Sequence, residues 1–76
     1  RKDLVKKVNE LAEEARISIR NTRRDANDEV EKKVQSESLP EDSLYEAEEE
    51  IQELTDQHTD KVEELSEKKE KEIMTV

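Results

Sequence analysis

The chain contains no cysteine, which excludes disulfides, thiolate chemistry and thiol metal ligands and is typical of a reducing compartment. Glycine is also absent and proline occurs once, so a helix is interrupted at only one point in 76 residues. Phe and Trp are missing too, which argues against a β-sheet. No apolar run approaches the roughly 20 residues of a membrane-spanning helix. We therefore expect a soluble, cytoplasmic chain with no membrane partner.

Charge is what the sequence has in abundance, because 49% of its residues are charged and only 29% are hydrophobic. Such a composition supports at most one small domain with a thin core. Disorder is an alternative, but the apolar residues recur at helical spacing, which argues against it. The chain begins at Arg1 without an initiator Met, so we expect it to derive from a longer protein.

The charges are divided unevenly between the two halves of the chain. Residues 1–38 hold ten Lys or Arg against nine acids, whereas residues 39–76 hold four Lys against fourteen acids. Four arginines form a block without any acid among them, namely Arg16, Arg20, Arg23 and Arg24. A guanidinium is always charged and can bind two phosphate oxygens at once. The block therefore indicates either ion pairs with acids of the second half or contact with nucleic-acid phosphates.

A stripe of small and apolar residues, spaced by three and four, predicts a helix over residues 2–35. Its members are Val5, Val8, Ala12, Ala15, Ile19, Thr22 and Ala26. Beyond Ala26 the stripe continues by fours through Val30 and Val34, a drift that favours a short bundle over a long regular coiled coil. Arg16, Arg20 and either Arg23 or Arg24 lie three or four apart, and we predict that these three arginines share an outer face away from this stripe.

The segment 36–40 is the predicted turn, because Pro40 cannot continue the preceding helix but fits the first turn of the next one. Ser38 and Glu41 have the spacing of a capping box. The alternative places the helix cap at Pro40, with Leu39 as a hydrophobic staple.

A second helix is predicted over residues 41–74, and it carries two apolar lines. The first line contains Leu44, Ala47, Ile51, Leu54, His58 and Leu65. The second contains Thr55, Thr59, Val62, Ser66 and Ile73. A helix with two such stripes normally contacts two partners, as in a three-helix bundle. We therefore expect an all-α fold, a single domain 1–76 that forms an antiparallel two-helix hairpin from a three-helix bundle. The third helix would be missing or supplied by another chain, through self-association or a partner helix.

Residues suited to catalysis or metal binding are scarce. His58 is the only histidine, and no further ligands converge on it at a recognisable spacing. The acidic run at 46–50 lies on a predicted straight helix, which turns carboxylates outward instead of wrapping them around calcium. We predict no metal site, no cofactor and no catalytic residue, and hence a protein that is not an enzyme.

Several segments resemble ribosome recycling factor in the same order and spacing. They are RKDLVK at 1–6, ARISIRN at 15–21, RRDAN at 23–27, EIQELTD at 50–56 and KEKEIM at 69–74. The resemblance spans nearly the whole chain, and the arginine block and the EIQELTD run are its most specific parts.

The resemblance implies the second and third helices of a three-helix-bundle domain. In that family a small β domain follows the first helix, and the whole protein splits the post-termination ribosome together with elongation factor G. Arginines of the bundle contact large-subunit rRNA. By motif position these are Arg20, Arg23 and Arg24, with Arg16 a weaker candidate. Because the first helix and the β domain are absent, we do not expect this chain alone to recycle ribosomes.

Three positions depart from the family pattern. Thr22, Thr59 and Ser66 stand where the family usually has Ile, Val or Leu, and burial of a hydroxyl without a partner costs roughly 1–3 kcal/mol. We expect all three to face the place where the family's first helix packs. Two hypotheses follow, namely a natural fragment of a recycling factor or an engineered derivative that serves as a helical scaffold or partner-binding hairpin.

Overall fold

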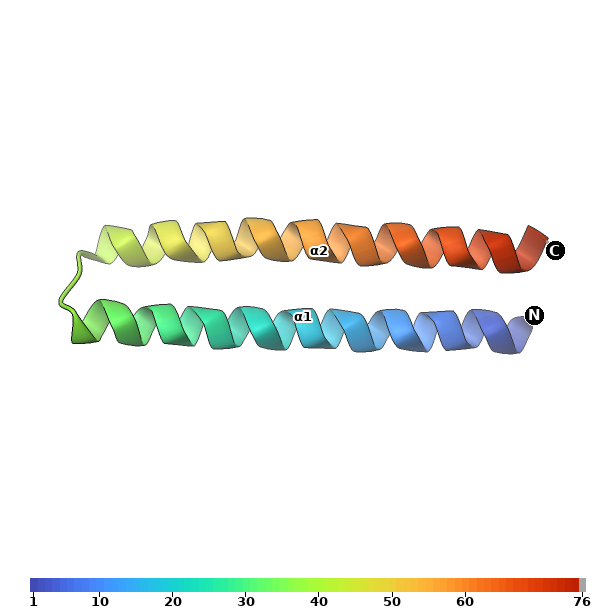
Figure 1. The fold of residues 1–76 in the computed structure, drawn as a ribbon, viewed down its shortest axis with the longest axis horizontal. Coiled ribbons are helices and arrows are strands. Elements are labelled where there is room, and N and C mark those ends of the chain that lie inside the picture. Colours follow the sequence, from blue (N-terminus) through green and yellow to red (C-terminus); the bar gives the residue numbers. More distant parts are fainter. Residues whose placement is uncertain (76) are drawn as a thin grey trace.

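The computed structural model describes residues 1–75, which form the helices α1 (Lys2–Ser36) and α2 (Glu41–Thr75). Val76, the last residue of the predicted domain, lies outside the described residues. The helices run antiparallel, with the turn at one tip and both chain ends at the other (Figure 1). The predicted all-α hairpin is confirmed. It is a rod of 58 × 16 × 9 Å.

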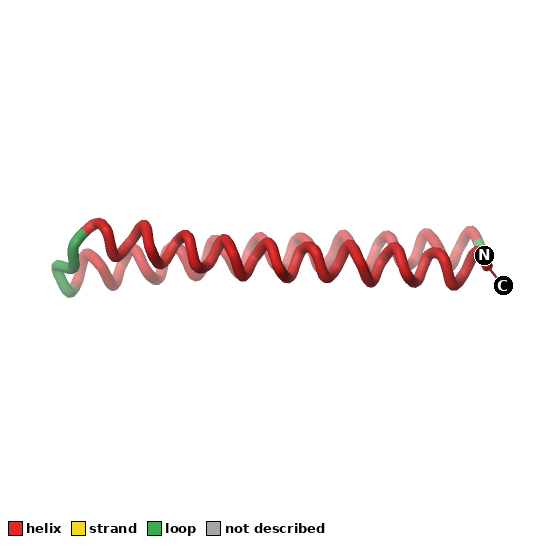
Figure 2. Tube along the Cα trace, turned by 90° about the horizontal axis from the view of Figure 1, so that it is seen from above, coloured by secondary structure: helices red, strands yellow, loops and turns green. Residues whose placement is uncertain are grey.

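The two helices lie side by side along their whole length, as the two views show together (Figures 1 and 2). The α1 residues turned toward α2 come from the predicted stripe and are half-buried, namely Val5, Val8, Ala15, Ile19, Ala26, Val30 and Val34. Ala12, 7% exposed, is the only fully buried residue among residues 1–75. The core is therefore a single seam of side chains between the helices, most deeply buried at Ala12.

One position of the predicted stripe is wrong. Thr22 is exposed, and the half-buried residue at this level of the seam is Arg23. The side of α1 that faces α2 passes from Ile19 to Arg23, a step of four residues where the prediction used three. Each residue adds about 100° of rotation, so the difference carries Thr22 to the edge of the seam.

The two predicted lines of α2 differ in their surroundings only in part. The second line faces α1, and its residues Thr55, Thr59, Val62, Ser66 and Ile73 are all half-buried. On the first line, Leu44, Ala47 and Ile51 are half-buried as well, whereas Leu54, His58 and Leu65 are exposed. The expectation for Thr59 is therefore wrong, because it packs toward α1 within the hairpin and not toward a missing helix.

Helix α1 ends in a Schellman motif. The N–H of Ser38 donates to the carbonyl of Gln35 at 3.3 Å, and the N–H of Leu39 donates to the carbonyl of Val34 at 3.0 Å. This pair of hydrogen bonds requires a left-handed backbone conformation at the first residue after the helix cap. That residue is Ser38, which has φ 52°. Glycine usually fills this position, but the sequence contains none.

The start of α2 differs from the predicted capping box. The helix begins at Glu41, and the carbonyl of Pro40 accepts a hydrogen bond from the N–H of Ser43 at 3.0 Å. Ser38 is part of the end of α1, so the capping-box prediction is wrong and the alternative with Pro40 before the helix is right. Glu41 and Asp42 lie in the first turn, where negative charge complements the helix dipole.

Candidate nucleic-acid interface

The hairpin presents a different face on each side of the seam. Because α1 turns by about 100° per residue, Arg20 and Arg24 lie on one side of the seam and Leu11 and Thr22 on the other. We call the first side the arginine face and the second the apolar face.

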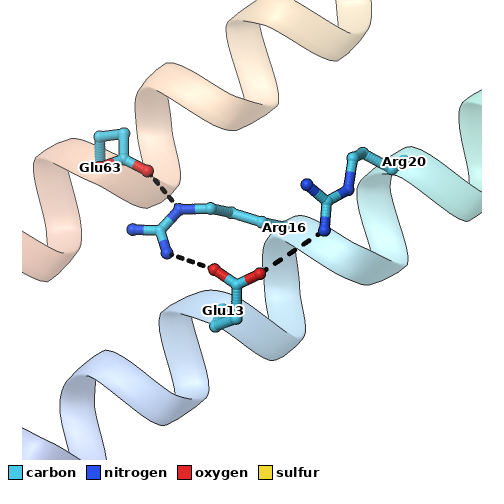
Figure 3. Close-up of polar contacts among 4 residues, drawn as sticks. All are labelled: Glu13, Arg16, Arg20 and Glu63. Atoms are coloured by element: carbon cyan, nitrogen blue, oxygen red, sulfur yellow. Dashed lines mark hydrogen bonds and ion pairs between the residues drawn. The ribbon is translucent and has the colours of Figure 1, made fainter.

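Arg16 lies at the edge of the seam on the arginine face, with 30% of its side chain exposed. Its Nε forms an ion pair with Oε1 of Glu63 on α2, and its Nη1 lies 3.0 Å from Oε2 of Glu13 (Figure 3). Hydrogen bonds to Glu63 first, and then to Glu13, raise the pKa of Arg16. At this position the arginine pairs with an acid of the second helix, as one of the two sequence hypotheses held.

Glu63 is the α2 partner in this contact. The hydrogen bond from Arg16 lowers the pKa of Glu63 below its ordinary value of 4.5. Among the described residues, Arg16–Glu63 is the only ion pair that joins the two helices. It therefore links the two helices on the arginine face, with the modest strength of a part-exposed ion pair.

The other three arginines are more weakly held. Arg20 is exposed, and its Nη2 lies 3.5 Å from Oε1 of Glu13. The Nη2 of Arg24 donates to Oδ1 of Asn21 at 2.8 Å. Within residues 1–75, neither Arg23 nor Arg24 forms an ion pair.

A shallow groove of about 400 Å³ brings these three arginines together. Its lining residues are Arg20, Asn21, Arg23, Arg24, Asn27 and Asp28. Three cations and two amides thus surround one carboxylate. The Oδ1 of Asn27 is buried and has no hydrogen-bond partner among the described residues. The groove has the charge and the donors to hold an anion such as a phosphate.

The sequence predictions for the arginines are right in part. Arg20 and Arg24 are exposed on the outer face, whereas Arg23, the other alternative, is half-buried beside the seam. The prediction is wrong for Arg16, which is half-buried beside the seam as well. Long guanidinium side chains can lie along a seam of small residues and still reach its edge.

Sequence reasoning missed five residues of this face, namely Glu13, Asn21, Asn27, Asp28 and Glu63. The spacing of three residues from Asn21 to Arg24 and from Glu13 to Arg16 is a signal that was available for two of them. Asn27 and Glu63 carry no such signal, because their surroundings depend on how α2 lies against α1.

The apolar face carries two grooves, of about 330 and 380 Å³. The first lies toward the turn and is lined by residues such as Ser18, Thr22, Ala26, Ile51, Leu54 and His58. The second lies toward the chain ends, where Leu11 and Leu65 are 52% and 48% exposed. Thr22 lines the first groove, and Ser66, which is half-buried on the line that faces α1, lines the second.

His58 is exposed at the rim of the first groove, with its Nδ1 2.8 Å from the carbonyl oxygen of Leu54. In the part of the chain that the structure describes, no three His, Cys, Asp or Glu side chains are grouped to hold a metal ion. Neither described helix is long and apolar enough to cross a membrane.

Sequence matches to known proteins cover the residues that form both faces. The sequence model of the family described as ribosome recycling factor matches residues 1–74. The chain belongs to this family. It is 53% identical over all 76 residues to the ribosome-recycling factor of Salinibacter ruber, 51% identical to that of Synechocystis sp. and 46% identical to that of Bacillus subtilis.

These matches cover 100% of the chain but only 40%, 42% and 41% of the three relatives. The chain thus spans about two fifths of a ribosome recycling factor and forms a helical part of it. The resemblance drawn from the sequence is confirmed, whereas the comparisons lend no support to an engineered scaffold. No solved structure matches the chain.

Proposed function

We propose that the chain is the rRNA-binding helical part of a ribosome recycling factor, and that Arg20, Arg23 and Arg24 contact phosphates of large-subunit rRNA. The observation that carries this proposal is the groove on the arginine face, in which three arginines converge with one carboxylate among them. Family membership supports it, because the matched relatives are named for ribosome recycling.

The charge distribution is compatible with RNA binding in spite of the net charge of -9. Most of the negative charge lies on α2, and salt limits its reach to a Debye length of about 8–10 Å. A local cluster of guanidinium groups therefore still attracts phosphate. The groove lacks aromatic side chains for stacking on bases, so binding depends on the RNA backbone and shape.

Arg16 has a different role in this proposal. Its cation already interacts with the carboxylates of Glu13 and Glu63, and a phosphate would have to compete with both. We assign it mainly to holding α1 against α2, with only a minor contribution to RNA binding.

The activity of the longer protein is a further part of the proposal. In the cytoplasm, a complete recycling factor splits the post-termination ribosome together with elongation factor G, by binding and without catalysing a chemical step. The present chain spans only part of such a protein. We expect it to bind the large subunit without splitting ribosomes.

Co-sedimentation with purified large ribosomal subunits tests the RNA-binding proposal. We expect wild-type binding at about 50 mM salt that weakens steeply toward 200 mM, as phosphate contacts require. Arg20→Glu, Arg23→Glu and Arg24→Glu together should weaken binding by at least about 100-fold.

The matched control reverses three cations of α2 in Lys68→Glu, Lys69→Glu and Lys71→Glu, which changes the net charge equally. It should alter binding by only a few-fold, on the order of a long-range charge effect. Equal losses in both triple variants, or no binding by the wild type at low salt, would overturn the proposal.

The apolar face supports a second candidate function, that of a hairpin that binds a further helix. Its two adjoining grooves and the half-exposed Leu11 and Leu65 form a stripe of the kind that a third helix covers in a bundle. The third helix would come from a partner chain or a second copy of this chain. Light scattering tests the second case, because a strict monomer at high concentration rules out self-association.

A further inference from the structure

We infer that Glu13 acts as a built-in competitor of phosphate on the arginine face and thereby sets how strongly Arg20 binds RNA. This inference rests on the proposed RNA-binding function. It concerns a residue that is neither a cation nor part of the groove that the three arginines line.

Glu13 divides its carboxylate between two arginines of its own helix. Oε2 lies 3.0 Å from Nη1 of Arg16, and Oε1 lies 3.5 Å from Nη2 of Arg20 (Figure 3). Arg16 has a second anchor in Glu63, whereas Glu13 is the only ion-pair partner of Arg20 among residues 1–75. Loss of the Glu13 charge would therefore leave Arg16 paired and would release Arg20.

The contact between Glu13 and Arg20 is weak enough to be displaced. Both side chains are more than half exposed, and the pair is longer than the one to Arg16. Exposed pairs of this kind are screened by salt and are stable by only a small margin. A phosphate that binds Nη2 of Arg20 competes with this carboxylate, and a phosphate on the other N–H groups still approaches a negative charge nearby.

The three arginines of the groove are consequently not equivalent. Arg23 and Arg24 form no ion pair in the described part of the chain, although Asp28 lines the same groove, so a phosphate displaces no paired carboxylate from them. Arg20 binds phosphate in competition with Glu13. Glu13 is thus a positioning residue, which acts on RNA through Arg20 and not by its own contact.

The test compares Glu13→Gln with Glu14→Gln in the large-subunit co-sedimentation assay. Both changes remove one negative charge from adjacent positions of α1, but Glu14 is turned about 100° away and forms no ion pair within residues 1–75. We expect Glu13→Gln to bind about two- to fivefold more tightly than Glu14→Gln, as release from an exposed pair implies. Circular dichroism checks that both variants keep the helix content of the wild type.

A second pair of variants isolates the role of Arg20. In an Arg20→Gln background, the advantage of Glu13→Gln over Glu14→Gln should disappear, because a double-mutant cycle reports only the coupling between the two changed residues. Equal affinities of the two glutamine variants, or an advantage that persists without Arg20, would overturn the inference while leaving the RNA-binding proposal intact. Absence of binding by the wild type removes both.

Discussion

The arginine face and the apolar face flank the same seam of α1 but depend on different partners. On the arginine face, Arg16 is paired with Glu13 and Glu63, whereas Arg23 and Arg24 form no ion pair among the described residues. On the apolar face, Leu11 and Leu65 expose about half of their surface to solvent. The first face therefore leaves cations for an anionic partner, whereas the second needs another helix before its apolar surface is buried.

The seam between the two helices buries too little apolar surface to compensate for the apolar side chains left exposed on the apolar face. Only Ala12 is fully buried among the described residues, and hydrophobic stabilisation scales with the apolar area removed from water, at about 25 cal/mol per Å². Two helices of 35 residues each therefore gain little from contact with one another alone. We expect the stability of the fold to depend on the apolar face and its RNA binding to depend on the arginine face.

The largest expected effect comes from a change to the apolar face. Leu11→Glu combined with Leu65→Glu should weaken self-association or binding of a partner helix by at least about 100-fold, because burial of a Leu side chain contributes roughly 1.5–3 kcal/mol when complete. Light scattering and the concentration dependence of Tm measure this. Ile17→Glu is the control, because Ile17 is also exposed, at 43%, but lies outside both grooves. A wild type that melts cooperatively as a monomer would contradict this prediction.

The second prediction concerns the seam that both faces share. Ala12→Leu inserts a large side chain at the one buried residue of the described seam, and we expect a loss of about 1–3 kcal/mol in the free energy of unfolding from overpacking. Ala15→Leu is the matched control, because Ala15 lies on the same stripe but is only half-buried, so we expect a smaller loss there. Urea unfolding followed by circular dichroism compares the two. An equal cost at both positions would show that the seam is no tighter at Ala12 than at its edge.

A smaller effect is expected at the turn, away from both faces. Ser38→Gly should stabilise the hairpin by about 0.5–1 kcal/mol, because glycine adopts the left-handed conformation of Ser38 without the steric cost. The same change at Ser18, inside α1, should destabilise it by roughly 0.5–1 kcal/mol. Thermal unfolding at a fixed concentration measures both, and equal signs would contradict the assignment of the Schellman motif.

The smallest expected effect is the pH dependence of the arginine face. The pKa of Glu63 is lowered in the folded chain, so its ion pair with Arg16 stabilises the fold fully above the ordinary pKa of 4.5, and this stabilisation is lost as the pH falls through the lowered value. We expect Glu63→Gln to melt below the wild type near neutral pH and together with it well below pH 4.5. Glu67→Gln, a change of equal charge outside any ion pair in residues 1–75, should show no such convergence.

Much of the fold could be predicted because helical spacing is a local property. The stripe from Val5 to Ile19 was identified from spacings of three and four, and these side chains do face α2. The error at Thr22 arose because the stripe could continue from Ile19 by a step of three residues or of four. Only the position of α2 against α1 decides which of the two residues lies at the seam. Thr59 was misplaced for the same reason, since two stripes on one helix do not reveal which of them faces which partner.

The candidate site was less predictable than the fold. The positions of Arg20 and Arg24 follow from their distance to the apolar stripe along α1. The partners of Arg16 do not, because the contact with Glu63 joins residues 47 positions apart and depends on the antiparallel register of the two helices. The conformation of Ser38 was also hidden, since a capping box and a Schellman motif both tolerate serine near a helix end.

The rod shape of the hairpin has a mechanical consequence. Two helices packed side by side resist bending better when they cannot slide along each other. Both the packed seam and the Arg16–Glu63 pair oppose such sliding. Because the chain ends lie at one tip and the turn at the other, a displacement imposed at the tip with the chain ends is transmitted over the 58 Å length to the turn (Figure 1). The arginine face, on the flank of this rod, would then be carried along as a rigid part of a lever.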